Sequence, residues 1–167
     1  MQSDHFFLAE IVKGVMHFMP DKEKKVLRVI VCRPGEVAEI VEIEDRLEAM
    51  QDIVGGLIEE WDPFYSRTDP RYENVLLICN DEGKLLQLPK SRAIYDEDWR
   101  LLDKISGPFF ICYGPVESES FESLPPDLEE EFYKKFKLPE KFYETERGTM
   151  VIRYDPRKKP PERDEVR

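Results

Sequence analysis

Short apolar runs separated by polar turns dominate the pattern of this chain. The runs are rich in valine, isoleucine and phenylalanine, which favour strands, and each is too short for a typical helix. They cover residues 26–32, 37–43, 57–61, 74–80 and 109–114. Arg33-Pro34-Gly35-Glu36 is a tight turn between the first two runs, and the last run is almost continuously apolar, as in a central strand. The pattern predicts a mostly antiparallel sheet of five or six strands.

Three other segments carry apolar residues at the spacing of an amphipathic helix. Asp45 can cap a short helix that packs on the sheet and ends at Gly55-Gly56, where glycine enters the left-handed conformation. A C-terminal helix over about 126–137 opens at a proline pair, and an N-terminal helix is expected over 4–19. We therefore predict an α+β fold in which the N- and C-terminal helices are additions to the sheet. Residues 1–154 would form a single domain, and 155–167 a flexible charged tail.

The segment from Asn74 to Ala93 is the most informative for function. A turn at Asn80-Asp81-Glu82-Gly83 leads from one apolar run to the next, which predicts a β-hairpin whose second arm returns Leu85, Leu86 and Leu88 to the core. The loop that leaves this hairpin presents basic side chains in an acidic protein, and the planar fork of arginine suits a carboxylate or a phosphate. The candidate ligand-binding residues are Asn80, Glu82, Lys84, Lys90, Ser91 and Arg92.

An alternative interpretation gives this loop a structural role only. Arg92 could form an internal salt bridge with Glu82 across the mouth of the hairpin, which would leave no group for a ligand. Beyond the loop, residues 93–104 have a mixed pattern that suggests a broken helix anchored by Ile94 and Trp99. Residues 150–154 could form a last edge strand.

The charge of the chain narrows the possible partners. Of its 167 residues 37% are charged, and the formal net charge is −11. An acidic surface repels the phosphate backbone, so direct binding to nucleic acid is not expected. Such a surface can attract a basic protein surface, although solubility alone would also explain it.

No motif in the chain indicates catalysis, a cofactor or a metal. Cys32, Cys79 and Cys112 lie in apolar runs without metal-ligand spacing, so we expect buried free thiols in a reducing compartment. His5 and His17 lie together near the N-terminus, away from any candidate nucleophile, and phosphate-binding glycine loops are absent. With no signal peptide and no apolar run long enough to span a bilayer, the sequence predicts a cytoplasmic protein that is not an enzyme.

Two regions are candidates for binding a partner protein. Phe7, Ile11 and Val15 lie on the apolar stripe of the N-terminal helix, which could pack on the core, form a homodimer or enter a groove on another chain. The polar loop 62–73 carries Phe64 and Tyr65, and aromatic side chains exposed on loops are typical contact residues.

Five ordered blocks resemble a known family over about residues 26–114. They are Arg33-Pro34-Gly35-Glu36, Leu47-Glu48-Ala49-Met50-Gln51 with Val54-Gly55-Gly56, Ile78-Cys79-Asn80-Asp81-Glu82-Gly83-Lys84-Leu85, Leu88-Pro89 with Arg92-Ala93, and Ile105, Gly107 and Phe109. Together they resemble the small bacterial and phage proteins catalogued as domain of unknown function 3846. The family's usual asparagine before the arginine is Ser91 here. The resemblance implies no particular activity, but it implies a protein carried on phages, plasmids or conjugative elements, sometimes beside anti-restriction genes.

These observations favour a protein that acts by binding. We expect a non-enzymatic accessory protein of a phage or other mobile element that inhibits a host defence protein through its acidic surface. The alternative is a protein that binds or sequesters a nucleotide-like or other small anionic ligand with residues 80–92. An enzyme that uses carboxylates and Arg92 is a further alternative.

Overall fold

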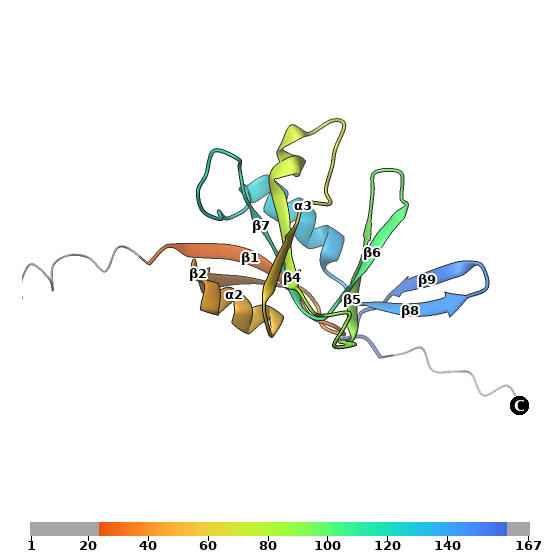
Figure 1. Ribbon diagram of the computed structural model, residues 1–167. Helices are drawn as coiled ribbons and strands as arrows, with labels where there is room; N and C mark the ends of the chain where they lie inside the picture. The colour runs from red at the N-terminus through yellow and green to blue at the C-terminus, as the bar shows by residue number, and fades with distance from the viewer. Residues whose placement is uncertain (1–23, 160–167) are drawn as a thin grey trace, which may run out of the picture.

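The computed structural model describes residues 24–159, which form a five-stranded antiparallel sheet with two smaller hairpins beside it (Figure 1). The sheet has the order β2-β1-β7-β4-β3. Its strands are β1 (Val26–Cys32), β2 (Glu39–Glu44), β3 (Ile58–Trp61), β4 (Val75–Asn80) and β7 (Phe109–Tyr113). The hairpins are β5 (Lys90–Tyr95) with β6 (Leu101–Ser106), and β8 (Glu140–Thr145) with β9 (Gly148–Arg153). The α+β class and the mostly antiparallel sheet that the sequence predicts are confirmed.

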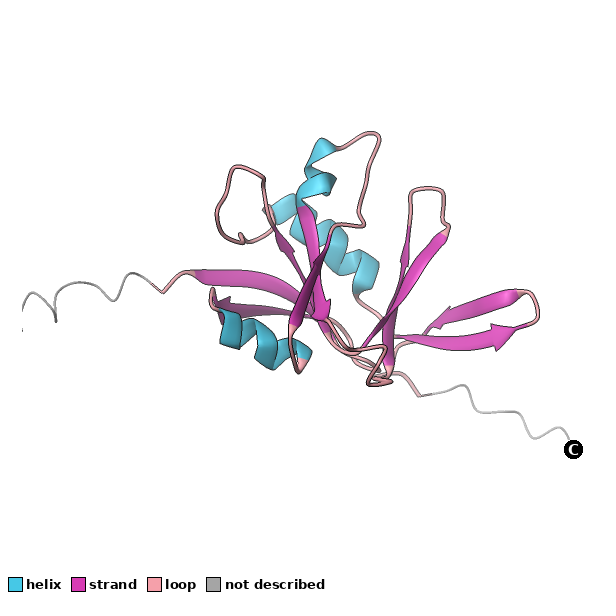
Figure 2. Ribbon diagram, in the orientation of Figure 1, coloured by secondary structure: helices cyan, strands magenta, loops and turns pink. Residues whose placement is uncertain are grey.

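One helix covers each face of the five-stranded sheet (Figure 2). Side chains alternate between the faces along each strand, as the pleat requires. On β1, Val29 and Val31 pack towards α2 (Leu47–Val54), whereas Ile30 and Cys32 pack towards α3 (Pro126–Phe136). The central strand β7 divides in the same way and is buried on both faces. The two cores explain why the strands read as near-continuous apolar runs.

Helix α3 belongs to the core and is not an addition to it. It begins at the proline pair, and Leu128, Phe132 and Phe136 are buried. The ring of Phe64 packs edge-on against Phe132 at 5.0 Å between centroids and against Phe136 at 5.8 Å. The loop before the 3-10 helix (Pro70–Asn74) thus supplies part of the aromatic core between α3 and the sheet. The expected N-terminal helix, residues 4–19, lies outside the described residues.

The predicted hairpin after β4 is wrong. β4 pairs with β3 and β7, and residues 81–87 form a series of turns. The side-chain oxygen of Asn80 accepts a hydrogen bond from the Glu82 amide, and the Leu86 amide donates to the Glu82 carbonyl, so the chain coils instead of extending. Leu85 is 80% exposed and Leu86 is 55% exposed, whereas both were expected in the core.

The segment expected as a broken helix is the hairpin of β5 and β6. The carboxylate of Asp96 accepts hydrogen bonds from the amides of Asp98 and Arg100, which holds the turn between the two strands. Trp99 lies in this turn with a φ of 59° and is 76% exposed, so it does not anchor a core. The expected edge strand at 150–154 is present as β9, which pairs with β8 in a separate hairpin and not with the main sheet.

The start of α2 differs from the prediction, whereas its end agrees with it. The residue that precedes the helix is Arg46 and not Asp45, and no side chain caps the first turn. Gly55 follows the helix in the left-handed conformation, with a φ of 79° and its amide bonded to the Gln51 carbonyl. Glycine is suited to this position because it has no Cβ to clash.

Candidate ligand-binding cleft

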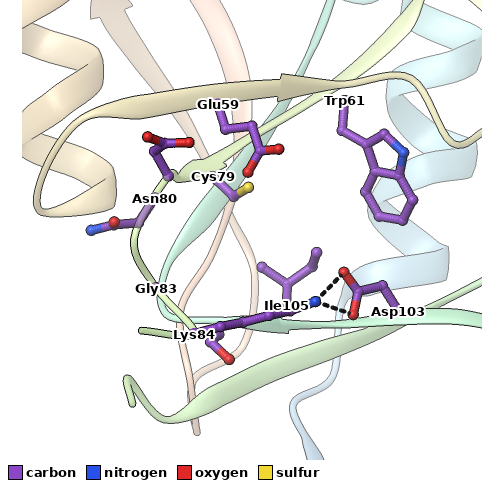
Figure 3. Close-up of a pocket in the computed structure, with 10 residues that line it drawn as sticks. Glu59, Trp61, Cys79, Asn80, Gly83, Lys84, Asp103 and Ile105 are labelled. Carbon is purple, nitrogen blue, oxygen red and sulfur yellow. Dashed lines mark hydrogen bonds and ion pairs between the residues drawn. The ribbon is translucent and has the colours of Figure 1, made fainter. Parts of the chain in front are cut away.

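A cleft of about 300 Å³ lies between β3, at one edge of the five-stranded sheet, and β6 of the neighbouring hairpin (Figure 3). The end of β4 and the turn after it close the cleft. Its lining residues are Glu59, Trp61, Cys79, Asn80, Asp81, Gly83, Lys84, Asp103, Ile105 and Ser106. The cleft exists because β3 and β6 belong to different sheets and do not pair with each other.

One wall of the cleft is formed by alternate residues of β3. Glu59 and Trp61 are two positions apart, so they lie on the same face of the strand, and both point into the cleft in Figure 3. Ile105 of β6 lies on the opposite wall. Trp61 and Ile105 therefore provide two apolar surfaces, and Glu59 provides a carboxylate between the strands.

The thiol of Cys79 lies in the floor of the cleft and is not suited to nucleophilic attack. Cys79 is 8% exposed. Burial, together with the negative charges of Glu59 and Asp103, raises the pKa of this thiol to about 11. The thiol is therefore protonated at neutral pH, and the thiolate that a cysteine nucleophile requires is not formed.

An ion pair closes the far side of the cleft. The Lys84 ammonium donates to both carboxylate oxygens of Asp103, at 2.6 and 2.7 Å. Lys84 follows a close approach of the chain, because a Cβ on Gly83 would collide with the Ser106 carbonyl oxygen. This contact, and not a positive φ, explains the glycine in the turn. With Asp81 and Glu59, the cleft has three carboxylates and one ammonium, so it favours ligand groups that donate hydrogen bonds.

A second hollow, of about 480 Å³, lies on the other side of the same ion pair. The two hollows share Lys84, Asp103 and Ser106. The second one also contains Lys90 and Lys104, together with Gln87 and Leu88. The Lys104 ammonium donates to Glu144 at 2.7 Å, and this hydrogen bond raises the pKa of Lys104. Three lysines face two carboxylates, Asp103 and Glu144, which leaves one net positive charge around this hollow.

The structure separates the six predicted ligand-binding residues into two groups. Lys84, Lys90 and Asn80 line the hollows, and Glu82 is exposed on the turn. Asn80 is 6% exposed, and its side-chain amide donates to the Val54 carbonyl. Ser91 and Arg92 are buried away from both hollows.

Arg92 holds the fold together through main-chain carbonyls. Its guanidinium donates to the carbonyls of Phe136, Arg33, Glu36 and Ser91 at 2.7–3.2 Å, and to the Ser91 hydroxyl at 3.3 Å. These contacts join the end of α3, the turn between β1 and β2, and β5. Arg92 is 1% exposed and therefore faces no ligand; it forms these bonds in place of the expected salt bridge with Glu82.

The predicted partner-binding residues are also divided. Phe64 is 4% exposed in the aromatic core, so it is not a contact residue. Tyr65, next in the chain, is 62% exposed and can contact a partner. Phe7, Ile11 and Val15 lie outside the described residues.

Sequence reasoning missed most of the cleft. Glu59 and Trp61 belonged to a correctly predicted strand, but nothing in the sequence showed that this strand is an edge facing a second sheet. Asp103 was assigned to the segment that was expected as a broken helix, and Ile105 was not assigned to a strand. The spacing of Glu59 and Trp61 on one face was the available signal.

Residues 24–159 contain neither a metal-ligand cluster nor a membrane-spanning helix. No group of three or more histidine, cysteine, aspartate or glutamate side chains in that range converges as metal ligands. In the same range, no helix combines the length and the hydrophobicity that crossing a membrane requires.

Comparison with known proteins identifies a family for this chain. No curated protein and no solved structure matches the chain. Residues 27–137 match the family described as Domain of unknown function (DUF3846). The match runs from β1 to α3, so it includes the cleft, Arg92 and a helix that the sequence resemblance had left out, but not the hairpin of β8 and β9. Because more than half of the chain is matched, the protein belongs to this family.

Proposed function

We propose that this protein acts by binding, and that the cleft between β3 and β6 captures a small organic ligand without chemical conversion. The observation that carries the proposal is the arrangement of Trp61, Glu59 and Asp103. A flat ring can lie between Trp61 and Ile105, while the two carboxylates accept hydrogen bonds from its amino or amide groups. Ligand sites are commonly apolar clefts of about 300–1,000 Å³ with a few placed polar groups, and this cleft lies at the small end of that range.

The charges in the cleft support binding more than catalysis. Lys84 is paired with Asp103, and the Cys79 thiol has a raised pKa, so neither is an activated nucleophile. Asn80, the remaining polar group of the floor, uses its amide to bond Val54 and Glu82. The groups left to a ligand are hydrogen-bond acceptors and apolar surfaces, which suit the binding of a molecule with donor groups.

Native mass spectrometry tests this proposal. The purified protein is measured before and after exposure to a boiled, protein-free extract of the cells in which it occurs. We expect a discrete small-mass adduct that is lost in Trp61→Ala and kept in Trp99→Ala, since Trp99 is the second tryptophan and lies outside the cleft. An adduct of equal abundance in both variants would contradict binding in this cleft.

A second candidate is a partner protein that the acidic surface recognises, in line with inhibition of a host defence protein. The turn after β4 displays Leu85 and Leu86 beside Asp81 and Glu82. Neither acid has an ion-pair partner among residues 24–159. Hydrogen bonds from the Leu86 amide to Glu82 and from the Leu88 amide to Gly83 hold the turn. An ordered turn that presents leucines and acids suits an apolar pocket with a basic rim.

Affinity purification at low and high salt tests the second candidate. We expect a partner that is retained at low salt, released at high salt, and lost in the Leu85→Ala/Leu86→Ala variant. The matched control is Leu101→Ala/Leu102→Ala, a second pair of adjacent exposed leucines, at 39% and 46% exposure. Retention that is unchanged at high salt would exclude recognition through the acidic surface.

A further inference from the structure

The second hollow has a charge opposite to that of the cleft it adjoins. Three carboxylates and one ammonium line the cleft, whereas three ammonium groups and two carboxylates surround the second hollow. The two spaces meet at the ion pair of Lys84 and Asp103. A ligand that filled both would carry donor groups at one end and negative charge at the other.

From this geometry we propose that the second hollow holds the phosphate of the same ligand, so that the ligand is a nucleoside phosphate. The inference rests on the proposed function, since the ring would occupy the cleft beside Trp61. The amino and imino groups of a base can donate hydrogen bonds to the carboxylates of Glu59 and Asp103. A phosphate suits Lys84, Lys90 and Lys104 because several ammonium groups can each bond a different phosphate oxygen, with lysine acting as a point charge.

A carboxylate holds two of the lysines together. Glu144 lies between them, with its oxygen 2.7 Å from the Lys104 ammonium and 3.9 Å from that of Lys90. The Lys104 ammonium also donates to the Thr149 hydroxyl at 3.1 Å, which ties the hollow to the hairpin of β8 and β9. One carboxylate between two ammonium groups reduces their repulsion without cancelling it. An incoming phosphate would supply the missing negative charge.

The ion pair of Lys84 and Asp103, which both hollows share, couples binding of the ring to binding of the phosphate. The side chain of Lys84 is long and 66% exposed, so the ammonium at its end can turn from Asp103 to a phosphate oxygen. Asp103 then has its Oδ2 available to a donor on the ring, while its Oδ1 still accepts from the Lys104 amide. The phosphate would thus draw Lys84 away from Asp103, and Asp103 would then bond the ring. Neither a free nucleoside nor free phosphate can form both contacts.

Fluorescence titration of the Trp99→Phe protein tests this inference, because Trp61 is then the sole tryptophan. The probes are the four ribonucleosides, their 5′-monophosphates and inorganic phosphate. We expect at least one monophosphate to change Trp61 fluorescence with a Kd at least tenfold below that of its nucleoside. The difference should shrink at high salt and in Lys90→Ala, and persist in Lys134→Ala, whose lysine lies on α3 and pairs with Glu130. Lys104→Ala serves as a second variant, with circular dichroism to check the hairpin.

The outcomes separate this inference from the proposed function. A nucleoside that binds as tightly as its monophosphate would overturn the phosphate site and leave capture in the cleft standing. Inorganic phosphate that binds as tightly as the monophosphates would show an anion site that is independent of the ring, and would also overturn the inference. If no probe binds, the nucleoside phosphate is excluded, and the proposed function then depends on the mass of the adduct in the extract.

Discussion

The two ends of residues 80–92 behave differently from the middle. At the ends, Asn80, Ser91 and Arg92 are at most 6% exposed, and their polar groups bond main-chain atoms. In the middle, Lys84 and Lys90 reach into the two hollows with side chains that are 66% and 40% exposed. The ends fix the fold, whereas the lysines of the middle are exposed at the two hollows.

The difference shows that residue type does not separate a structural polar group from a binding one. Arg92 and Lys84 are both basic and lie in one short segment. Arg92 donates to four carbonyls in three parts of the chain, among them that of Phe136 at the C-terminus of α3. Lys84 pairs with a single carboxylate at the surface, which a ligand can replace. What decides the role is the number of groups that depend on the side chain.

The largest effect is expected at Arg92. Arg92→Met keeps much of the side-chain volume but removes every donor, so the buried carbonyl of Phe136 keeps only a long contact from the Cys32 thiol, and the part-buried carbonyls of Arg33 and Glu36 each lose a hydrogen bond. Each unsatisfied buried acceptor costs about 1–3 kcal/mol, and we expect the free energy of unfolding to fall by about 3 kcal/mol or more. Urea denaturation followed by circular dichroism measures this. Arg92→Lys is the control, which should recover part of the loss because it keeps the charge but not the planar fork.

A loss below about 1 kcal/mol in Arg92→Met would contradict a structural role. It would return Arg92 to the set of candidate ligand-binding residues and remove the contrast between the ends and the middle of the segment.

A smaller loss is expected at the other end, for Asn80→Ala. The side chain of Asn80 joins the end of α2 to the turn after β4, through the Val54 carbonyl and the Glu82 amide. Both groups lose a partner, and the expected cost is about 1–3 kcal/mol in urea denaturation. Lys84→Ala is the matched control from the middle of the segment, where exposed ion pairs contribute little. Equal losses in the two variants would remove the contrast.

Some parts of the fold could be predicted from the sequence, and others could not. Strands buried on both faces, such as β1 and β7, are readable because burial imposes a continuous apolar run. Leu85 and Leu86 look equally apolar, but they are exposed because Asn80 coils the chain into turns before they can pair. The cleft was not predictable because its walls come from two sheets, and no local pattern reports which edges of separate sheets face each other.

The pH dependence of stability tests the role of Glu140, whose carboxylate bonds the residue that follows Arg92. Glu140 is 7% exposed and accepts a hydrogen bond from the Ala93 amide at 2.9 Å. Burial raises the pKa of this carboxyl above its ordinary value of 4.5, despite the opposing effects of that bond and of Arg153 and Arg92. The folded protein therefore binds the proton more tightly than the unfolded chain, so this contribution is complete below pH 4.5 and is lost as the pH rises through the folded pKa.

Glu140→Gln keeps an acceptor for Ala93 but does not titrate. We expect the stability of the natural protein, relative to Glu140→Gln, to fall as the pH rises above 4.5 and then to level off. Urea denaturation over a pH series measures the difference, which isolates Glu140 from the other carboxyls. A relative stability that rises over this range would mean that the charged form of Glu140 is favoured by folding.

The smallest effect is expected for Leu85→Ala and Leu86→Ala. If these leucines lay on the arm of a hairpin, as their pattern suggests, each truncation would cost about 2–5 kcal/mol, as in a core. Because they are 80% and 55% exposed, we expect changes within about 0.5 kcal/mol. Leu77→Ala on β4, where the leucine is 0% exposed, is the control that should show the full core penalty in the same urea assay. A core-like loss at Leu85 would mean that the segment pairs as a strand, which would close the cleft at the turn that supplies Lys84.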